Sequence, residues 1–367
     1  MKERIMMNSK ISPFTRTPGV AGKAIIETHF SDEIINNFNS EDSYKYVYKI
    51  VGLRGSGKSV EYSLVMNHFR GEKKWLVYSL SAGGNPIQTL ISELSRIDFI
   101  NNKKVSQSIG GNIDASGNVG VLSAGVQAQG TINISENENY YSEEATLKGM
   151  LEKVSKEKYN VLVGVDDIAK TEEMAEFLSI LGTLIMDPNI NIRFICTGLS
   201  KNIEDFVNLP HLSFFARNES ITMQALNLHS MSQKYRQLLG ISHEDAAALS
   251  KFTKGYAYGY QVLGEICFNH QKYVIDEEIE AEFDETIGSQ YDLIWTTMTQ
   301  SEQDFIKIVT NTDTHAVADI KKAMNNTNSF NSLRDRLIKK HILVSPSYGC
   351  LEVPLPRFKE YVNIWHT

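Results

Sequence analysis

The chain is poor in cysteine, with three in 367 residues: Cys196, Cys267 and Cys350. They lie far apart, and no two of them have the spacing of a zinc or iron–sulfur motif, so a metal site built on cysteine pairs is excluded. Three scattered cysteines also cannot form the disulfide framework that is typical of small secreted proteins. We therefore expect a protein of the reducing cytoplasm.

Long apolar runs and an excess of positive charge are also missing. The first residues contain no hydrophobic core of a signal peptide, and no run approaches the length of a transmembrane helix, so we expect no membrane association. The formal net charge of −7 argues against a protein wrapped in nucleic acid and leaves room only for a local basic face. Hydrophobic residues make up 42% of the chain and charged residues 22%, which is typical of globular proteins.

The strongest motif is the segment from Gly52 to Ser59, which reads Gly-Leu-Arg-Gly-Ser-Gly-Lys-Ser. It fits the phosphate-binding pattern G-x-x-x-x-G-K-[S/T], which a chain of this length matches by chance about once in a hundred. A β-prone segment, residues 46–51, precedes the motif, and apolar residues at helical spacing follow it. The surroundings therefore favour a strand, a phosphate-binding loop and a helix over an ordinary glycine-rich turn.

This loop predicts a site for ATP and Mg²⁺. Its glycines let backbone N–H groups surround the phosphates, and the start of the following helix attracts the same anion. Lys58 is expected to reach the β- and γ-phosphates, and the Ser59 hydroxyl to ligate Mg²⁺. No Asn-Lys-x-Asp motif follows, so GTP is not expected. The predicted nucleotide-binding residues are Gly52, Arg54, Gly55, Ser56, Gly57, Lys58, Ser59 and Val60.

An acidic pair supplies the second half of this predicted site. The apolar run 161–165 ends in Asp166-Asp167, roughly 110 residues after the loop, as expected for a central parallel strand with carboxylates at its carboxyl end. Asp166 is predicted to hold Mg²⁺ through water. Asp167 is predicted to act as the general base that polarises the attacking water.

Two further side chains are candidates for the same chemistry. Thr197 ends the apolar strand 192–198 and is predicted to sense the γ-phosphate, although a polar residue that simply ends a strand is the alternative. Arg217 follows at the exit of the core, where an arginine finger or phosphate sensor is expected; a solvated surface arginine is its alternative.

The alternation of strand-like and helix-like segments predicts an α/β fold with a parallel sheet. The predicted organisation is an arm with a helix over residues 25–38 (1–40), a P-loop ATPase core (41–225), a helical lid (226–285) and a winged-helix domain (286–367). Within the core, residues 105–135 contain six glycines and one charge, Asp114. We interpret them as a β-hairpin insertion for self-association, with a surface loop as the alternative.

The C-terminal part has the order of a winged helix. Helices are predicted over residues 301–309, 317–324 and 330–340, before a hairpin formed by 342–344 and 351–353. The third helix carries Arg334, Arg336, Lys339 and Lys340, which suit DNA phosphates. Residues 286–367 nevertheless hold nine Lys/Arg against eight Asp/Glu. Without a basic stripe, duplex DNA and a protein partner both remain open.

Taken together, the chain resembles the AAA+/STAND-type P-loop ATPases, and is similar to the bacterial and archaeal ATPases related to origin-recognition proteins. The resemblance covers most of the chain and is carried by Gly52–Ser59 and Asp166-Asp167. It implies an ATP-hydrolysing switch whose lid and winged helix move with nucleotide state. The alternative is a DNA-binding module or oligomeric scaffold that holds ATP as a structural ligand.

Three departures from the family pattern concern the site. Asp167 stands where the family often has the longer glutamate, which implies slow hydrolysis. Gly22-Lys23 replaces a Gly-Arg pair near the adenine side. The lid has Gly255-Tyr256-Ala257 in place of Gly-x-Pro, so the lid sensor of the family is not expected here.

Overall fold

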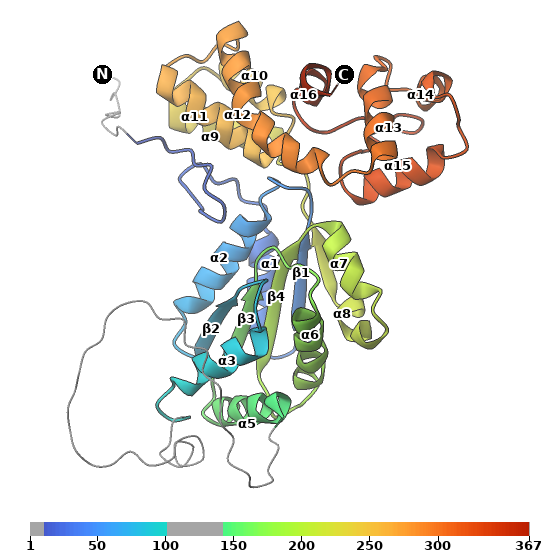
Figure 1. Cartoon of the computed structure of the whole chain (residues 1–367). Helices are drawn as coiled ribbons and strands as arrows, with labels where there is room; N and C mark the ends of the chain where they lie inside the picture. The colour runs from blue at the N-terminus through green and yellow to red at the C-terminus, as the bar shows by residue number, and fades with distance from the viewer. Residues whose placement is uncertain (1–10, 101–141, 367) are drawn as a thin grey trace, which may run out of the picture.

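The computed structural model describes residues 11–100 and 142–366, in which an α/β core lies beneath a helical layer (Figure 1). The predicted hairpin insertion, residues 105–135, lies outside the described residues. Among the helices described, none combines the length and hydrophobicity that crossing a bilayer requires.

The core is built on a five-stranded sheet with the order β2-β3-β4-β1-β5, in which every pairing is parallel. The predicted α/β fold with a parallel sheet is therefore confirmed. In sequence order the strands are Val47–Val51, Trp75–Leu80, Asn160–Val165, Ile192–Gly198 and Glu219–Thr222. Because the strands are parallel, the residues that follow β1, β3 and β4 meet at one edge of the sheet.

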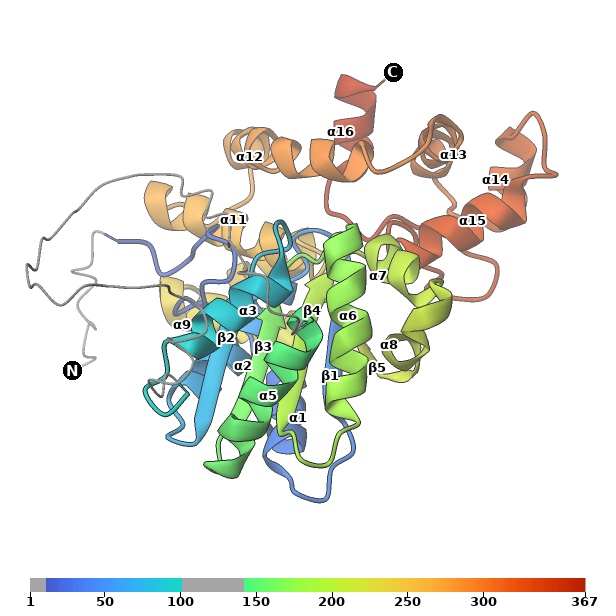
Figure 2. The same ribbon diagram turned by 60° about the horizontal axis from the view of Figure 1, so that its bottom comes forward.

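Helices cover both faces of this sheet. The core helices are α1 (Phe30–Asn39), α2 (Lys58–Arg70), α3 (Pro86–Ser95), α5 (Glu143–Lys156), α6 (Glu172–Ile185), α7 (Ser200–Val207) and α8 (Ser213–Arg217). Helices α1 and α2 pack on one face, and α3, α5 and α6 pack on the other (Figure 2). Both faces of β1 are buried, which explains why its sequence is apolar in nearly every position.

Helix α1 begins five residues later than predicted, at Phe30 rather than Ile25. Its first turn is capped by α2, because the Glu61 carboxylate accepts a hydrogen bond from the Ser31 N–H at 3.0 Å. Glu61 is 3% exposed and also accepts a hydrogen bond from the Thr28 hydroxyl at 2.7 Å. Residues 25–29 are therefore not helical, and His29, directly before the helix, has a φ of 65°.

The helical layer lies over the carboxyl edge of the sheet (Figure 1). It contains α9 (Leu228–Leu239), α10 (His243–Phe252), α11 (Ala257–His270), α12 (Glu277–Trp295), α13 (Gln300–Asn311), α14 (Val317–Ala323), α15 (Phe330–Lys339) and α16 (Phe358–Trp365). Helix α12 runs without interruption across the predicted lid boundary at residue 285. The arm, the lid and the C-terminal helices share one apolar cluster, which extends from Phe14 to Val362 and is distinct from the clusters on the sheet.

The three helices predicted for the winged helix are present as α13, α14 and α15. Between the two predicted hairpin arms, the described residues form a single antiparallel bridge, Val344 with Glu352, and Ala316 pairs with Cys350 in another. The sequence signal did not reveal α16, which packs on α12 and α13. The winged-helix interpretation stays a prediction.

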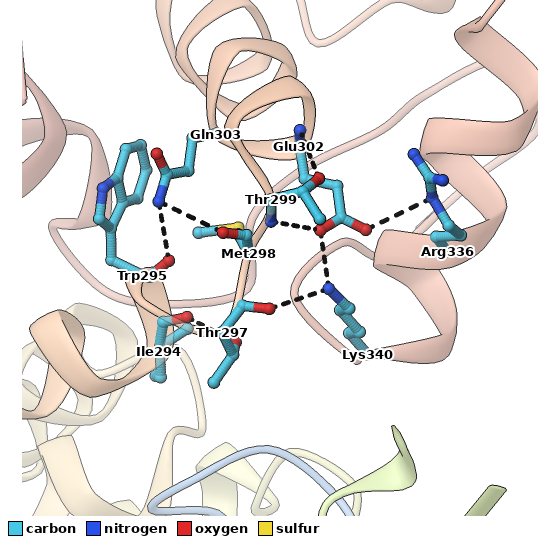
Figure 3. Close-up of polar contacts among 9 residues, drawn as sticks. All are labelled: Ile294, Trp295, Thr297, Met298, Thr299, Glu302, Gln303, Arg336 and Lys340. Carbon is cyan, nitrogen blue, oxygen red and sulfur yellow. Dashed lines mark hydrogen bonds and ion pairs between the residues drawn. The ribbon is translucent and has the colours of Figure 1, made fainter. Parts of the chain in front are cut away.

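A buried carboxylate ties α15 to the start of α13 (Figure 3). Glu302 is 1% exposed and accepts hydrogen bonds from the Thr299 N–H at 2.8 Å and from Lys340 Nζ at 2.7 Å. Arg336 Nε lies 3.4 Å from its other oxygen, and Lys340 also donates to the Thr297 carbonyl at 3.0 Å. The loop between α12 and α13 is thereby fixed to the end of α15.

We expect Glu302→Gln to lower the free energy of unfolding at neutral pH by about 2 kcal/mol, because Lys340 loses its charged partner. Burial raises the pKa of Glu302, but the hydrogen bonds from Lys340 and Thr299 outweigh it and hold this pKa below its usual value. The stabilisation is therefore present above the unfolded-state pKa and lost as pH falls through the folded-state pKa. Denaturant melts should show the two proteins converging in acid; a difference that persists there would contradict this assignment.

Candidate nucleotide-binding site

The phosphate-binding loop connects β1 to α2 as the motif requires. Strand β1 ends at Val51, and α2 begins at Lys58, so that the N-terminus of α2 faces the loop. Gly55 and Gly57 have φ angles of 73° and 97°, a region that favours glycine. A Cβ atom at Gly55 would also lie 2.3 Å from the Tyr256 hydroxyl oxygen. The glycines therefore allow both the turn and the close approach of the lid.

A cavity of about 540 Å³ opens beside this loop, and this volume is large enough for a nucleotide. Of the predicted nucleotide-binding residues, Arg54 through Val60 line it. Gly52 does not; it lies behind the loop, where a Cβ atom would meet Ser56 and Met223 within 3.0 Å. The arm residues 15–22 form another wall, and further lining residues include Ala257, Tyr258 and Gln261 of α11 and Gln290 of α12.

Lys58 lies at the phosphate end of the cavity and is 8% exposed. Its Nζ donates a hydrogen bond to the Leu53 carbonyl at 2.9 Å, so the ammonium lies against the loop itself. Burial lowers the pKa of Lys58 to about 8, with Asp167 and Asp166 opposing and Arg54 adding to that shift. A bound polyanion would stabilise this partly desolvated ammonium.

Three elements bring the predicted catalytic groups together. Asp166 Oδ1 accepts hydrogen bonds from the Ser59 hydroxyl at 3.1 Å and from the Thr197 hydroxyl at 2.5 Å. Thr197 is fully buried, and its hydroxyl also accepts the Asp167 N–H at 2.8 Å. The structure thus places Ser59, Asp166, Asp167 and Thr197 at one point, and Thr197 uses its hydroxyl to position both aspartates.

Asp167 adopts a backbone conformation that is uncommon for a residue with a side chain, with φ of 53°. Such strain persists where the surroundings enforce it, and here the hydrogen bond to Thr197 does so. Among the described residues, the Asp167 carboxylate has no hydrogen-bond partner, and it lines the cavity near Lys58. It is therefore free to accept a proton from a bound water molecule.

The oxygens of Ser59 and Asp166 are the hard ligands that Mg²⁺ prefers. Within residues 11–100 and 142–366, no group of three or more His, Cys, Asp or Glu side chains could hold a metal by itself. A magnesium ion at this point would therefore depend on phosphate oxygens for its remaining ligands, as is usual at nucleotide sites. The Ser56 hydroxyl is buried toward Gly52 and has no hydrogen-bond partner within these ranges.

Arg217 is not brought together with these residues in one chain. It ends α8 directly before β5, at the edge of the sheet opposite to the phosphate-binding loop, and its side chain is exposed. It is not among the residues that line the cavity. Its role as an arginine finger or phosphate sensor stays a prediction.

The lid contacts were not foreseen from the sequence. The Tyr256 hydroxyl donates to the Arg54 carbonyl at 2.8 Å, and the Tyr258 N–H donates to the Gly55 carbonyl at 2.9 Å. The arm is attached to the lid through the Thr15 N–H, which donates to Gln261 at 3.0 Å, and through the ion pair of Arg16 with Glu265. In the sequence, the departure from the family pattern at Gly255-Tyr256-Ala257 was the one feature that could have indicated an unusual contact between the lid and the loop.

Comparisons with known proteins agree with this architecture. The structure is similar to the Walker-type ATPase PABY2304 of Pyrococcus abyssi, with a TM-score of 0.60 and 11% identity over 90% of this chain and 95% of that chain. It is also similar to the ORC2 protein of Aeropyrum pernix in its ADPNP–ADP complexes, with a TM-score of 0.51 and 11% identity over 92% and 94%.

Sequence comparisons are less informative. Residues 289–362, from within α12 to α16, match a family described as a domain of unknown function (DUF8462). No curated protein sequence matches the chain. At 11% identity, the structural likeness establishes the fold: the chain has the P-loop ATPase fold of these archaeal ATPases, as its motifs predicted.

Proposed function

We propose that this protein binds ATP with Mg²⁺ and hydrolyses it at the γ-phosphate. The observation that carries the proposal is the meeting of Lys58, Ser59, Asp166, Asp167 and Thr197 in one cavity of nucleotide size. The arm and the lid close the remaining walls. This arrangement supports a nucleotide held between core and lid better than it supports a peptide or nucleic-acid groove.

In the proposed reaction, Asp167 takes a proton from a water molecule whose oxygen bonds to the γ-phosphorus. The bond from that phosphorus to the β–γ bridging oxygen breaks, and ADP keeps the electron pair. Lys58 offsets the charge that develops on the phosphate oxygens. Thr197 keeps the base in place through the Asp167 N–H. When bound beside Ser59 and Asp166, Mg²⁺ would withdraw charge from the phosphate oxygens.

We further propose that the nucleotide state is transmitted to the C-terminal helices through the lid. Tyr256, which contacts the loop, stacks near Tyr291 of α12, with ring centroids 6.4 Å apart. Tyr291 in turn packs against Phe358 and Tyr361 of α16, at 5.0 and 5.4 Å. These contacts form a continuous aromatic path from the phosphate-binding loop to the last helix.

The partner of the C-terminal helices is proposed to be protein, with duplex DNA as the second candidate. All four basic side chains that suggested DNA binding have acidic partners: Arg334 with Asp335, Arg336 and Lys340 with Glu302, and Lys339 with Glu204 of the core. DNA phosphates would have to displace these carboxylates, which weighs against α15 as a DNA-contacting element in this arrangement.

Replacing Lys58 with alanine tests the proposed function directly. We expect the affinity for ATP to fall at least tenfold, because a charge-assisted hydrogen bond to phosphate is worth roughly 1.5–3 kcal/mol. Titration of a fluorescent ATP analogue in the presence of Mg²⁺ would measure it. Lys73→Ala, which removes an exposed lysine outside the cavity, is the matched control. An unchanged affinity in Lys58→Ala would refute ATP binding at this loop.

A further inference from the structure

Arg54 is a half-buried arginine without a partner. Four arginines in the described ranges are partly buried: Arg54, Arg193, Arg334 and Arg357. Arg193 donates to the Ile192 carbonyl and lies over the Tyr46 ring, Arg334 pairs with Asp335, and Arg357 pairs with Asp284 and Glu280. Within the same ranges, the Arg54 side chain forms no hydrogen bond or ion pair, and its Nε is fully buried. Such an arrangement is costly unless a ligand supplies the missing partner.

The position of Arg54 points to the terminal phosphates. Lys58 Nζ, the group expected at the β- and γ-phosphates, donates to the carbonyl of Leu53, the residue directly before Arg54. Arg54 lies four positions before Lys58 in the same loop, and both residues line the cavity. Two adjacent cations, one of them unpartnered, are suited to a polyanion with several charges.

The residues around the cavity include three basic ones, Arg16, Arg54 and Lys58, and three acidic ones, Glu61, Asp166 and Asp167. The charge of Arg16 is matched by Glu265 at 2.6 Å, and the Glu61 carboxylate is engaged with Ser31 and Thr28. Arg54 and Lys58 are therefore the two cations of the lining that remain for Asp166, Asp167 and the phosphates. Arg217, which was expected to add positive charge, lies at the opposite edge of the sheet.

The lid fixes the backbone from which the Arg54 side chain extends. The Tyr256 hydroxyl holds the Arg54 carbonyl, and the Tyr258 N–H holds the next carbonyl, that of Gly55. The backbone from which the guanidinium extends is therefore held in place by the lid. A fixed backbone leaves only the side chain to adjust when a phosphate arrives.

We propose that the Arg54 guanidinium is a second phosphate-binding cation, which recognises the terminal phosphate of ATP and so distinguishes ATP from ADP. The assignment rests on the proposed ATP binding. It gives the loop a specificity residue of its own, in addition to the role predicted for Arg217.

The test compares Arg54→Gln with Arg54→Lys in titrations with fluorescent analogues of ATP and ADP. We expect Arg54→Gln to weaken ATP binding about tenfold, because one charge-assisted hydrogen bond is lost, and to weaken ADP binding by less than about twofold. Arg54→Lys should recover part of the ATP affinity, since it keeps the charge but not the planar fork. Arg236→Gln, which removes an exposed arginine on α9, should change neither affinity.

These titrations measure binding, so their outcome does not depend on hydrolysis. Equal losses of ATP and ADP affinity in Arg54→Gln, or no loss, would overturn the assignment while leaving ATP binding intact. If neither the wild-type protein nor Lys58→Ala binds ATP, the proposed function fails and this assignment fails with it.

Discussion

Asp167→Asn is expected to slow ATP hydrolysis by about 100- to 10,000-fold, the usual contribution of a general base. Asparagine has the same size but cannot take the proton of the attacking water. The backbone N–H that Thr197 accepts is unchanged, so the loop after β3 should keep its conformation. Affinity for ATP should not fall by more than a few-fold from the wild-type value, because the negative charge of Asp167 repels the phosphates and its removal costs no attraction.

Release of phosphate, measured with and without duplex DNA, checks this expectation. Asp42→Asn, which alters an exposed aspartate outside the cavity, is the matched control and should hydrolyse ATP at the wild-type rate. Hydrolysis by Asp167→Asn at the wild-type rate would remove Asp167 from the mechanism. Stimulation of the wild-type protein by DNA would favour DNA over protein as the partner of the C-terminal helices.

Tyr291→Ala is expected to lower the free energy of unfolding by about 3–5 kcal/mol, as for other large buried aromatic side chains that are cut back to alanine. The ring is fully buried between the lid and the C-terminal helices, where it contacts Phe358, Tyr361 and Tyr256. Its hydroxyl donates to the Pro356 carbonyl at 2.5 Å. Alanine would leave a cavity and an unpaired carbonyl at this junction.

Tyr291→Phe separates these two effects, because it removes the hydroxyl and keeps the ring. It should cost about 1–3 kcal/mol, the penalty for leaving the Pro356 carbonyl buried and unpaired. Denaturant unfolding followed by tryptophan fluorescence suits both variants, since Trp295 packs against Phe358 and Tyr361. A loss below about 1 kcal/mol in Tyr291→Ala would show that the junction repacks.

The meeting of these residues at one edge of the sheet was predictable because their motifs are local in sequence. The residue spacing within Gly52–Ser59 is the one that a loop needs to surround a phosphate group, so it can be recognised in the sequence. Asp166-Asp167 can be recognised because it ends an apolar strand. Parallel strands then bring both groups to the same edge of the sheet without further information. Thr197 followed from the same rule, since it lies near the end of the neighbouring strand.

The walls of the cavity could not be predicted in this way, because they depend on contacts between distant residues. Thr15 and Gln261, which join the arm to the lid, are separated by 246 residues. The hydrogen bond by which Glu61 caps α1 likewise cannot be predicted from the spacing of apolar residues in a helix. The pairing of the basic residues on α15 depends on Glu302 and Glu204, which lie outside that helix. Periodicity identifies elements, but not the side chains that other elements bring to them.

The division of the apolar residues into separate cores has a mechanical consequence. The strands that carry the aspartates and Thr197 pack in the clusters around the sheet, whereas Phe14 and the lid belong to the upper cluster, against which Leu53 of the phosphate-binding loop also packs. The cavity lies between the sheet and the upper cluster, and residues of both line it. Under the proposed function, a nucleotide in this cavity would contact both parts, and its loss would remove contacts between them. Because α16 packs in the upper cluster, any rotation of that cluster relative to the sheet would carry the C-terminal helix with it.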